Sequence, residues 1–337
     1  MPQLLSKTIW LDAPESLRFA DEPVAAPDAG EMLCRTEVSA ISPGTEIAAW
    51  KGMRPLRPGP IYPRLQGYCN VATVLELGPG CAGLEVGDRV LTHQSHRSHF
   101  TARTNTVLYR LSAEADARHI ATAYLYHLGY HAVIDGGVRA GHRVLVQGLG
   151  VLGLTSAAMA KQAGASVFAV SDQSEPSRVA MAAGADGVLT RNALDTALEI
   201  DGESARFDVV ISTVNGWGDW QRALTATARR GTIACLGFPG RGEEAPAHNP
   251  LPSEHFYDRQ LTVKAVGMAP LANEARGHLR FNLADNMAYI CKLIEKGALD
   301  AELLISGSFP AAEAETAYRK LASRDGSPLT YLLEWSA

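Results

Sequence analysis

The chain has 337 residues, which exceeds the ~150 of one typical domain, so we expect two domains. Its 46% hydrophobic and 20% charged residues are typical of a folded globular protein and exclude a disordered or collagen-like chain. The formal charge of −5 provides no general attraction for nucleic acid or anionic lipid, and we expect neither as a partner.

At the start of the chain, charged residues interrupt every apolar run of MPQLLSKTIWLDAPESLRFA. No uncharged apolar stretch of ~18 residues follows, so we expect neither a secretion signal nor a membrane span. The five cysteines are scattered, with no Cys-x-x-Cys pair, and this usage suits a reducing compartment. We therefore expect a cytoplasmic protein.

Short β-like runs separated by proline and glycine fill the first third of the chain. They are residues 31–42, 70–78, 88–93 and 105–111. This pattern predicts a small, irregular β domain. The period then becomes helical over residues 117–135, which predicts a helix leading into a second domain.

Strands and helices alternate regularly in the middle of the chain. We predict strands at residues 142–148, 166–172, 187–190, 207–213 and 232–238, and helices from residue 151 onward, at 177–184 and at 219–231. Apolar strands separated by helix-length segments indicate a parallel sheet covered on both faces, a doubly wound α/β domain at residues 119–268. The short tail after it completes the β domain, which is therefore discontinuous, 1–118 and 269–337.

A glycine-rich turn connects the first parallel strand to its helix. It reads Gly148-Leu149-Gly150-Val151-Leu152-Gly153, and a G-x-G-x-x-G in this place predicts a cradle for the diphosphate of a dinucleotide. The second strand ends at Ser171-Asp172. The Asp172 carboxylate could bind the adenosine ribose of NAD, or Ser171 with Arg178 could accommodate the 2′-phosphate of NADP, and both remain open. Thr213 and Gly237 end later strands and are also expected to contact the coenzyme.

This order of domains resembles the medium-chain dehydrogenase/reductase superfamily, the zinc alcohol dehydrogenases and quinone reductases. The resemblance rests on Val38-Ser39-Ala40-Ile41-Ser42-Pro43-Gly44-Thr45-Glu46, Gly67-Tyr68-Cys69, Gly87-Asp88-Arg89-Val90, the turn at Gly148 and Gly184-Ala185-Asp186. It implies a GroES-like β-rich catalytic domain, a Rossmann domain that binds NAD or NADP, and a homodimer formed through residues 261–268. In motif the chain is most similar to the bacteriochlorophyllide hydroxyethyl dehydrogenase-like branch, which suggests a biosynthetic role.

The sequence departs from the zinc enzymes at their metal ligands. Pro43 stands where Cys-Gly-Thr-Asp supplies a cysteine, and Tyr68 stands where Gly-His-Glu supplies a histidine. The cysteine quartet of a structural zinc is missing as well. A catalytic zinc needs about three protein ligands, so we expect no zinc.

Without zinc, hydrogen-bond donors must stabilise the charge that develops on a carbonyl oxygen. Thr45 matches the position whose hydroxyl touches the substrate oxygen in the zinc enzymes, although their relay histidine is Ala48 here. Tyr68 either points into the cleft as a donor or packs in the β domain. Of His93, His96 and His99, we favour His93 and His96 as proton donors over a metal site. His127 and His131 are predicted to be interface or core residues.

Three hypotheses follow. The first is a zinc-independent NAD(P)-dependent oxidoreductase that interconverts a secondary alcohol and a ketone, with catalytic residues Thr45, Tyr68, His93 and His96. The second is an NADPH-dependent reductase of an activated C=C bond in an enone, quinone or enoyl thioester. The third is a nicotinamide-binding protein without turnover. The sequence does not specify the substrate.

Overall fold

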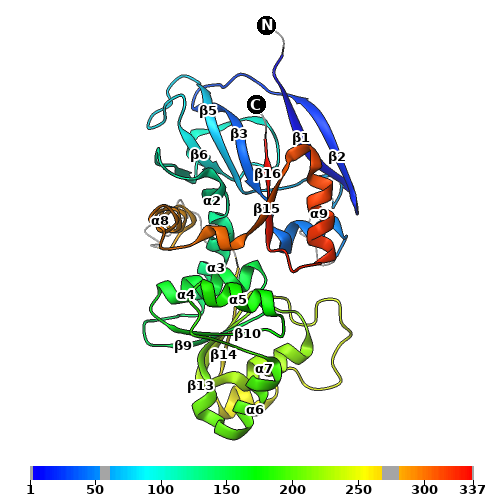
Figure 1. The fold of residues 1–337 in the computed structure, drawn as a ribbon, viewed down its shortest axis with the longest axis vertical. Coiled ribbons are helices and arrows are strands. Elements are labelled where there is room, and N and C mark those ends of the chain that lie inside the picture. Colours follow the sequence, from blue (N-terminus) through cyan, green and yellow to red (C-terminus); the bar gives the residue numbers. More distant parts are fainter. Residues whose placement is uncertain (1–2, 54–60, 268–280, 336–337) are drawn as a thin grey trace. The chain divides into compact units, whose positions relative to one another are not determined.

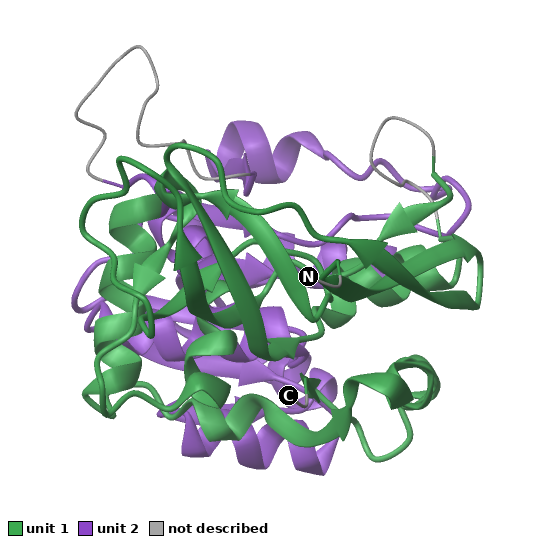
Figure 2. Cartoon of the chain, turned by 90° about the horizontal axis from the view of Figure 1, so that it is seen from above, with its two compact units in different colours: residues 1–124, 284–337 green, residues 125–283 purple. Residues whose placement is uncertain are grey.

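The computed structural model describes residues 3–53, 61–267 and 281–335. The chain forms two compact units, residues 1–124 with 284–337 and residues 125–283 (Figure 2). We call them the β-rich unit and the Rossmann unit. In the part of the chain that the structure describes, no helix is both long and apolar enough to span a bilayer.

The β-rich unit holds two sheets. In the smaller sheet the order is β2 (Ser16–Pro23), β1 (Leu5–Ala13) and β4 (Arg64–Leu65). The larger follows the order β15 (Ile305–Pro310), β16 (Thr330–Glu334), β3 (Glu31–Ala40), β5 (Asn70–Leu77), β6 (Arg89–Thr92) and β8 (Tyr109–Arg110), and β7 (His99–Arg103) also pairs with β3. The C-terminal strands pair with the N-terminal ones, because Leu332 of β16 faces Ala40 of β3.

Helix α9 (Ala314–Ser323) packs beside the first helical turn of this unit, the π-helical turn Pro43–Ile47 that follows β3. Ile41, Ile47, Tyr318 and Trp335 belong to one buried cluster there. Residues more than 270 positions apart in sequence therefore share one core. Burial of their large apolar surfaces supplies the stabilisation of this corner of the unit.

The Rossmann unit is built on six parallel strands in the order β11 (Gly187–Leu189), β10 (Ser166–Val170), β9 (Arg143–Gln147), β12 (Phe207–Ser212), β13 (Thr227–Cys235) and β14 (Thr262–Ala265). Helices α4 (Val151–Gln162) and α5 (Ser174–Ala182) cover one face, and α6 (Arg191–Asp201) and α7 (Trp217–Ala226) cover the other (Figure 1). The strand order reverses between β9 and β12, where doubly wound folds bind ligands. The predicted fold class is confirmed.

Some elements differ from the prediction. Helix α6 was not anticipated, although Thr190 caps it by accepting a hydrogen bond from Ala193 N. The predicted helix 219–231 is wrong beyond Ala226, because Thr227 begins strand β13 and pairs with Phe207 of β12. Backbone pairing along the sheet there outweighs helix propensity. The predicted helix 117–135 is interrupted at Thr122, giving α2 (Ala117–Ala121) and α3 (Ala123–Asp135).

Candidate functional site

The glycine turn of the Rossmann unit follows β9 directly. Gly148 has a φ of 87°, a conformation that favours glycine, and a Cβ there would lie 2.6 Å from Val214 Cγ1. A Cβ on Gly153 would overlap the carbonyl oxygen of Gly148. Both glycines are therefore required by the protein itself, the first for the turn and the last for the close approach of α4 to β9.

Gly150 differs from Gly148 and Gly153 in its backbone conformation and in its surroundings. It precedes the first residue of α4 with φ −79° and ψ −172°, an extended conformation open to any residue. A Cβ on Gly150 would meet no protein atom within 4 Å. Neither backbone strain nor internal packing accounts for this glycine. Close approach of a ligand to the helix N-terminus does account for it, and the free N–H groups there suit a diphosphate.

Thr213 and Gly237, predicted to contact the coenzyme, lie at the same edge of the sheet. The Thr213 hydroxyl donates to the carbonyl oxygens of Gln147 (2.8 Å) and Gly148 (3.1 Å), so it braces the turn. A Cβ on Gly237 would overlap Val214 O. The structure thus brings β9, β12 and β13 together at the point where the strand order reverses.

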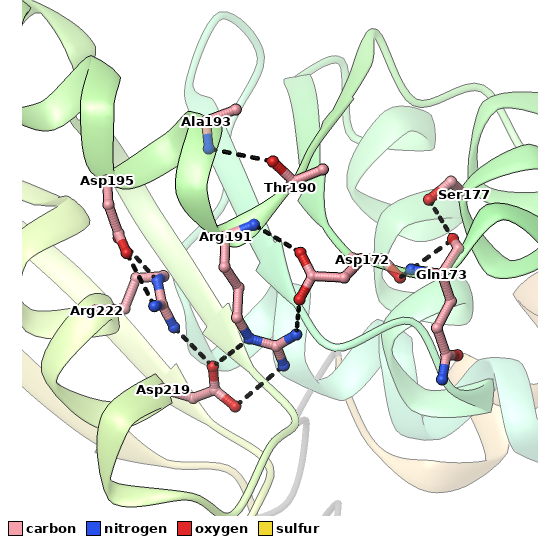
Figure 3. A network of polar contacts seen from close by, with 10 residues as sticks. Asp172, Gln173, Ser177, Thr190, Arg191, Ala193, Asp195, Asp219 and Arg222 are labelled. Atoms are coloured by element: carbon pink, nitrogen blue, oxygen red, sulfur yellow. Dashed lines mark hydrogen bonds and ion pairs between the residues drawn. The ribbon is translucent and has the colours of Figure 1, made fainter.

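Asp172 lies exposed just beyond the carboxyl end of β10. Its Oδ1 accepts the backbone N–H of Arg191 at 2.9 Å, and its Oδ2 pairs with the Arg191 guanidinium (Figure 3). Hydrogen bonds from the Arg191 backbone and side chain lower the pKa of the Asp172 carboxyl. The carboxylate is ionised and held in one orientation, as recognition of ribose hydroxyls requires.

Sequence reasoning missed the network behind Asp172. Arg191 also bonds Asp219 (Nε–Oδ1 3.0 Å), and Asp219 in turn accepts from Arg222, which forms a paired contact with Asp195 (Figure 3). Three carboxylates and two guanidiniums alternate, so each arginine is neutralised on both sides. In the sequence Arg191 directly follows the third strand, but its two partners, Asp172 and Asp219, come from two other segments of the chain.

Arg178 and Ser171, the alternative site predicted for a 2′-phosphate, have local partners in the structure. Arg178 forms a two-point ion pair with Glu175, one turn away on α5, at 2.6 and 3.0 Å. Ser171 accepts a hydrogen bond from Gln173 N at 3.1 Å. The cation that contacts Asp172 is Arg191, which the sequence interpretation did not name.

In the β-rich unit the candidate donors gather around Tyr68. The Tyr68 hydroxyl donates to Ser42 Oγ at 2.5 Å and is also hydrogen-bonded to Thr45. Burial raises the pKa of Tyr68 well above its usual range, and Cys69 and Glu46 add to this effect. The phenol is therefore neutral and able to donate a hydrogen bond at physiological pH.

His93 lies in the loop after β6 and contacts the same tyrosine. Its Nδ1 is 3.1 Å from the carbonyl oxygen of Tyr68, and because a carbonyl only accepts, Nδ1 carries the proton. In the neutral ring Nε2 is then the acceptor. Burial lowers the pKa of His93, despite its hydrogen bond to Tyr68 O. Tyr124 packs edge-on against both rings, with centroids 4.5 Å from His93 and 5.4 Å from Tyr68.

His96 is fully buried and its two ring nitrogens are both engaged. Nδ1 lies 2.8 Å from Ser39 Oγ and Nε2 lies 3.0 Å from Glu46 Oε2. Gly67 makes room for this ring, since its φ is 88° and a Cβ would lie 2.6 Å from the imidazole. His96 thus belongs to the interior of the unit, unlike His93.

Several other histidines and tryptophans have partners within their own unit. His99 begins β7 and its Nδ1 is 3.1 Å from Ser98 Oγ. His127 and His131, both buried, stack at 6.0 Å on α3. Trp220 belongs to a buried hydrophobic cluster of the Rossmann unit that includes Phe207 and Val210 of β12, and Trp217 packs against this cluster.

The donors of the β-rich unit do not fit a zinc ion. Across residues 3–53, 61–267 and 281–335, no three His, Cys, Asp or Glu side chains come together in a way that could hold a metal. Pro43 offers no donor, and burial raises the pKa of the Cys69 thiol far above neutrality. A thiol must lose its proton to bind zinc, so this position disfavours the ion.

In sequence and in fold, this chain is similar to known dehydrogenases. Residues 151–281 match the family model described as zinc-binding dehydrogenase. An alcohol dehydrogenase of Rhizobium meliloti (strain 1021) is 24% identical over 86% of this chain and 95% of its own. Two solved structures superpose with a TM-score of 0.80 over 98% of this chain. One, a short chain alcohol dehydrogenase of Escherichia coli CFT073 (16% identical, 99% covered), contains NADH; the other, a putative zinc-binding dehydrogenase of Sinorhizobium meliloti 1021 (19%, 100% covered), contains NADP.

Proposed function

We propose that this chain is an NAD(P)-dependent dehydrogenase of the zinc-binding dehydrogenase superfamily, and that it interconverts a secondary alcohol and a ketone without zinc. The observation that carries the proposal is the Tyr68 cluster: a phenol kept neutral, beside two hydroxyls and a neutral histidine, at the place where the zinc enzymes carry metal ligands. The alcohol dehydrogenase relative supports the substrate class.

The Rossmann unit would bind the coenzyme. The N-terminus of α4 at Gly150 takes the diphosphate, Asp172 takes the adenosine ribose, and Thr213 with Gly237 shapes the crevice. When bound, the nicotinamide supplies or accepts the hydride. The chain's own task is to stabilise the charge on the substrate oxygen and to move one proton.

Tyr68 and Thr45 are proposed as the hydrogen-bond donors to that oxygen, replacing the metal as the electrostatic stabiliser. The single O–H of Tyr68, which donates to Ser42 Oγ in the structure, would turn to the substrate oxygen when substrate binds. His93 is proposed as the base in alcohol oxidation, because its Nε2 accepts while Nδ1–H stays on Tyr68 O. The hydroxyl proton passes to His93 and the hydride leaves the carbinol carbon. His96, both of whose nitrogens are occupied, is proposed as a positioning residue.

We propose NAD as the preferred coenzyme. Asp172 and its network carry three carboxylates against two guanidiniums, and both arginines are already paired on each side. An additional 2′-phosphate would meet the exposed Asp172 carboxylate and would have to displace it from Arg191. The vicinal hydroxyls of the NAD ribose can donate to it directly.

The test is hydride transfer followed by the absorbance of reduced nicotinamide. Protein with NAD and a panel of secondary alcohols is expected to turn over, and the reverse reaction with ketones likewise. Turnover confined to enones with NADPH would replace this proposal by C=C reduction. Elemental analysis of protein purified without a metal column tests the zinc claim separately, and stoichiometric zinc would refute it.

We also propose that the protein is a cytoplasmic homodimer. Strand β14 is an edge of the parallel sheet, and all four of its residues are exposed in the described chain. An unpaired edge can continue its sheet into a second copy across a twofold axis. Light scattering is expected to give twice 36.0 kDa, and Val263→Pro, which blocks strand pairing, is expected to give monomers.

A further inference from the structure

Asp219 lies in the middle of the charge network behind Asp172, and the proposed chemistry does not use it. It is the third residue of α7, where a carboxylate also suits the positive end of the helix dipole. Its Oδ1 accepts from Arg191 Nε at 3.0 Å and from Arg222 Nη1 at 2.9 Å, and its Oδ2 accepts from Arg191 Nη2 at 3.3 Å (Figure 3). Both oxygens of Asp219 are therefore bonded to guanidinium groups.

Arg191 is held from two sides by carboxylates. Its Nη1 donates to Asp172, whereas its Nε and Nη2 both donate to Asp219. A side-on pair of this kind fixes the plane of a guanidinium as well as its position. The Asp219 side chain is 19% exposed and that of Arg191 is 42% exposed. The more buried of the two partners thus anchors the arginine.

Asp219 is itself fixed by the rest of the network. Arg222, which donates to Asp219, also donates from Nε and Nη2 to Asp195 at 2.8 and 2.9 Å. Because Arg222 is tied to α6 in this way, Asp219 does not follow Arg191 outward without breaking further ion pairs. Three carboxylates against two guanidiniums leave the network with one net negative charge.

An arginine beside the ribose site is what recognition of NADP requires. Arg191 is in that place, because its backbone N–H and its guanidinium both contact Asp172, the residue proposed for the adenosine ribose. A paired contact with a 2′-phosphate takes two N–H groups of one guanidinium. Arg191 can offer such a pair only if it leaves Asp219. The chain therefore carries a cation suited to NADP, and Asp219 withholds it.

We propose that Asp219 is a positioning residue for the choice of coenzyme: it holds Arg191 side-on, against Asp172 and away from a 2′-phosphate. The inference rests on the proposed coenzyme site, but not on the reaction that is catalysed. It assigns part of the discrimination between NAD and NADP to α7, a helix that follows β12 and not the strand of Asp172.

The experiment compares Asp219→Asn with Asp195→Asn in the full chain. Each variant removes one negative charge from the same network, but only Asp219→Asn loosens Arg191. The dissociation constants of NADH and NADPH are measured by calorimetric titration at one ionic strength, and no turnover is needed. We expect Asp219→Asn to tighten NADPH ~10-fold relative to NADH, because a charge-assisted pair with the 2′-phosphate becomes available. Asp195→Asn is expected to change this ratio less than ~2-fold.

A purely structural role of Asp219 at the start of α7 predicts a different result. Loosening of the helix would weaken NADH and NADPH by the same factor and leave their ratio unchanged. The double variant Asp219→Asn with Arg191→Gln tests whether the gain passes through the guanidinium. We expect the gain for NADPH to disappear in it.

A variant with the opposite expected sign keeps the outcome decisive if Asp219→Asn does not fold. Arg222→Gln leaves Asp219 to Arg191 alone and adds one net negative charge to the network. We expect NADPH to bind ~5-fold more weakly relative to NADH in this variant. An unchanged or lower discrimination against NADPH in Arg222→Gln would then contradict the role of Asp219.

An unmoved ratio in Asp219→Asn, or equal gains in Asp219→Asn and Asp195→Asn, would overturn the proposal. Equal gains would mean that net charge alone sets the preference. If NADH binds and the ratio does not move, the coenzyme site stands and the role of Asp219 falls. If the ratio moves as expected while no alcohol or ketone is turned over, the proposed reaction fails and the role of Asp219 stands. If neither coenzyme binds the wild type, both fail.

Discussion

The glycine turn of the Rossmann unit and the Tyr68 cluster of the β-rich unit are built by opposite means. The turn is made of backbone: Gly148 and Gly153 allow a tight bend and a close helix, and a Cβ on Gly150 would meet no protein atom at the start of α4. The cluster is made of side chains from distant segments, joined through Ser42, Glu46 and His96.

The difference shows what each kind of site tolerates. A site made of backbone atoms requires glycines at fixed positions, because a side chain there would fill the space that the site needs. One added methyl group can therefore break it. A side-chain site depends on donors and acceptors that must agree in direction, so an isosteric change can disable it while the fold persists. The following variants test this contrast.

The largest effect is expected for Gly153→Ala. A Cβ there overlaps Gly148 O, a backbone atom that cannot turn aside, and α4 must move away from β9. We expect the protein to lose about 3 kcal/mol of stability, the upper end for overpacking. Chemical unfolding followed by circular dichroism measures this loss. An unchanged unfolding midpoint would show that the turn is not close-packed as described.

Tyr68→Phe should come next. It removes the hydroxyl and keeps the ring that packs on Tyr124. A fall in kcat of ~10²-fold is expected, because one positioned donor is lost, with the melting temperature nearly unchanged. Steady-state kinetics with a secondary alcohol measure it. The matched control is Tyr109→Phe, a tyrosine of β8 whose hydroxyl bonds Glu295, and activity there should persist.

Gly150→Ala separates ligand approach from folding. Its Cβ meets no protein atom, so we expect the stability of the apoprotein to be retained. Coenzyme affinity should fall ~10-fold, equivalent to about 1.4 kcal/mol, because the methyl occupies the space of the diphosphate. Calorimetric titration with NADH measures it. If Gly150→Ala binds NADH as tightly as wild type, the diphosphate does not lie at this helix terminus.

Asp172→Asn tests the choice of coenzyme. The amide removes the charge that opposes a 2′-phosphate and releases Arg191 from one of its two partners. We expect the ratio of kcat/KM for NAD over NADP to fall about 5-fold. The control is Glu175→Gln, which frees Arg178 on the adjacent helix. A larger change in that control would return the 2′-phosphate to Ser171 and Arg178.

The smallest effect concerns Gln147, the last residue of β9. It is 2% exposed, and its side-chain amide has no hydrogen-bond partner in residues 3–53, 61–267 and 281–335. Replacing it by leucine removes a buried polar group of similar size. We expect Gln147→Leu to gain about 1 kcal/mol of stability, read from the unfolding midpoint. A loss of stability would show that the amide is satisfied in solution.

Most of the fold was predictable because its signals are local. Strands such as 166–172 and 207–213 are apolar throughout, and a parallel sheet needs that pattern wherever helices cover both faces. The helix at 191–201 was missed, and the helix at 219–231 was drawn too long, because pairing of Thr227 with β12 is a tertiary contact. The domain boundaries predicted at residues 118 and 268 stay predictions. The compact units of the structure divide the chain after residues 124 and 283.

Of the candidate site, Thr45, Tyr68 and His93 were named from sequence, and their roles stay predictions. The structure places them in one cluster with Ser42 and Tyr124, which no spacing indicated. Arg191 as the partner of Asp172 was not foreseen either.

The sequence by itself determined the glycine turn and the alternation of strands and helices, because backbone conformation and side-chain period are properties of neighbouring residues. Only the tertiary structure decided which titratable groups meet. His93 and His96 are three residues apart, yet one lies at the edge of the cluster and the other is sealed between Ser39 and Glu46. Burial and hydrogen-bond partners set their chemistry, and both come from segments far away in the chain.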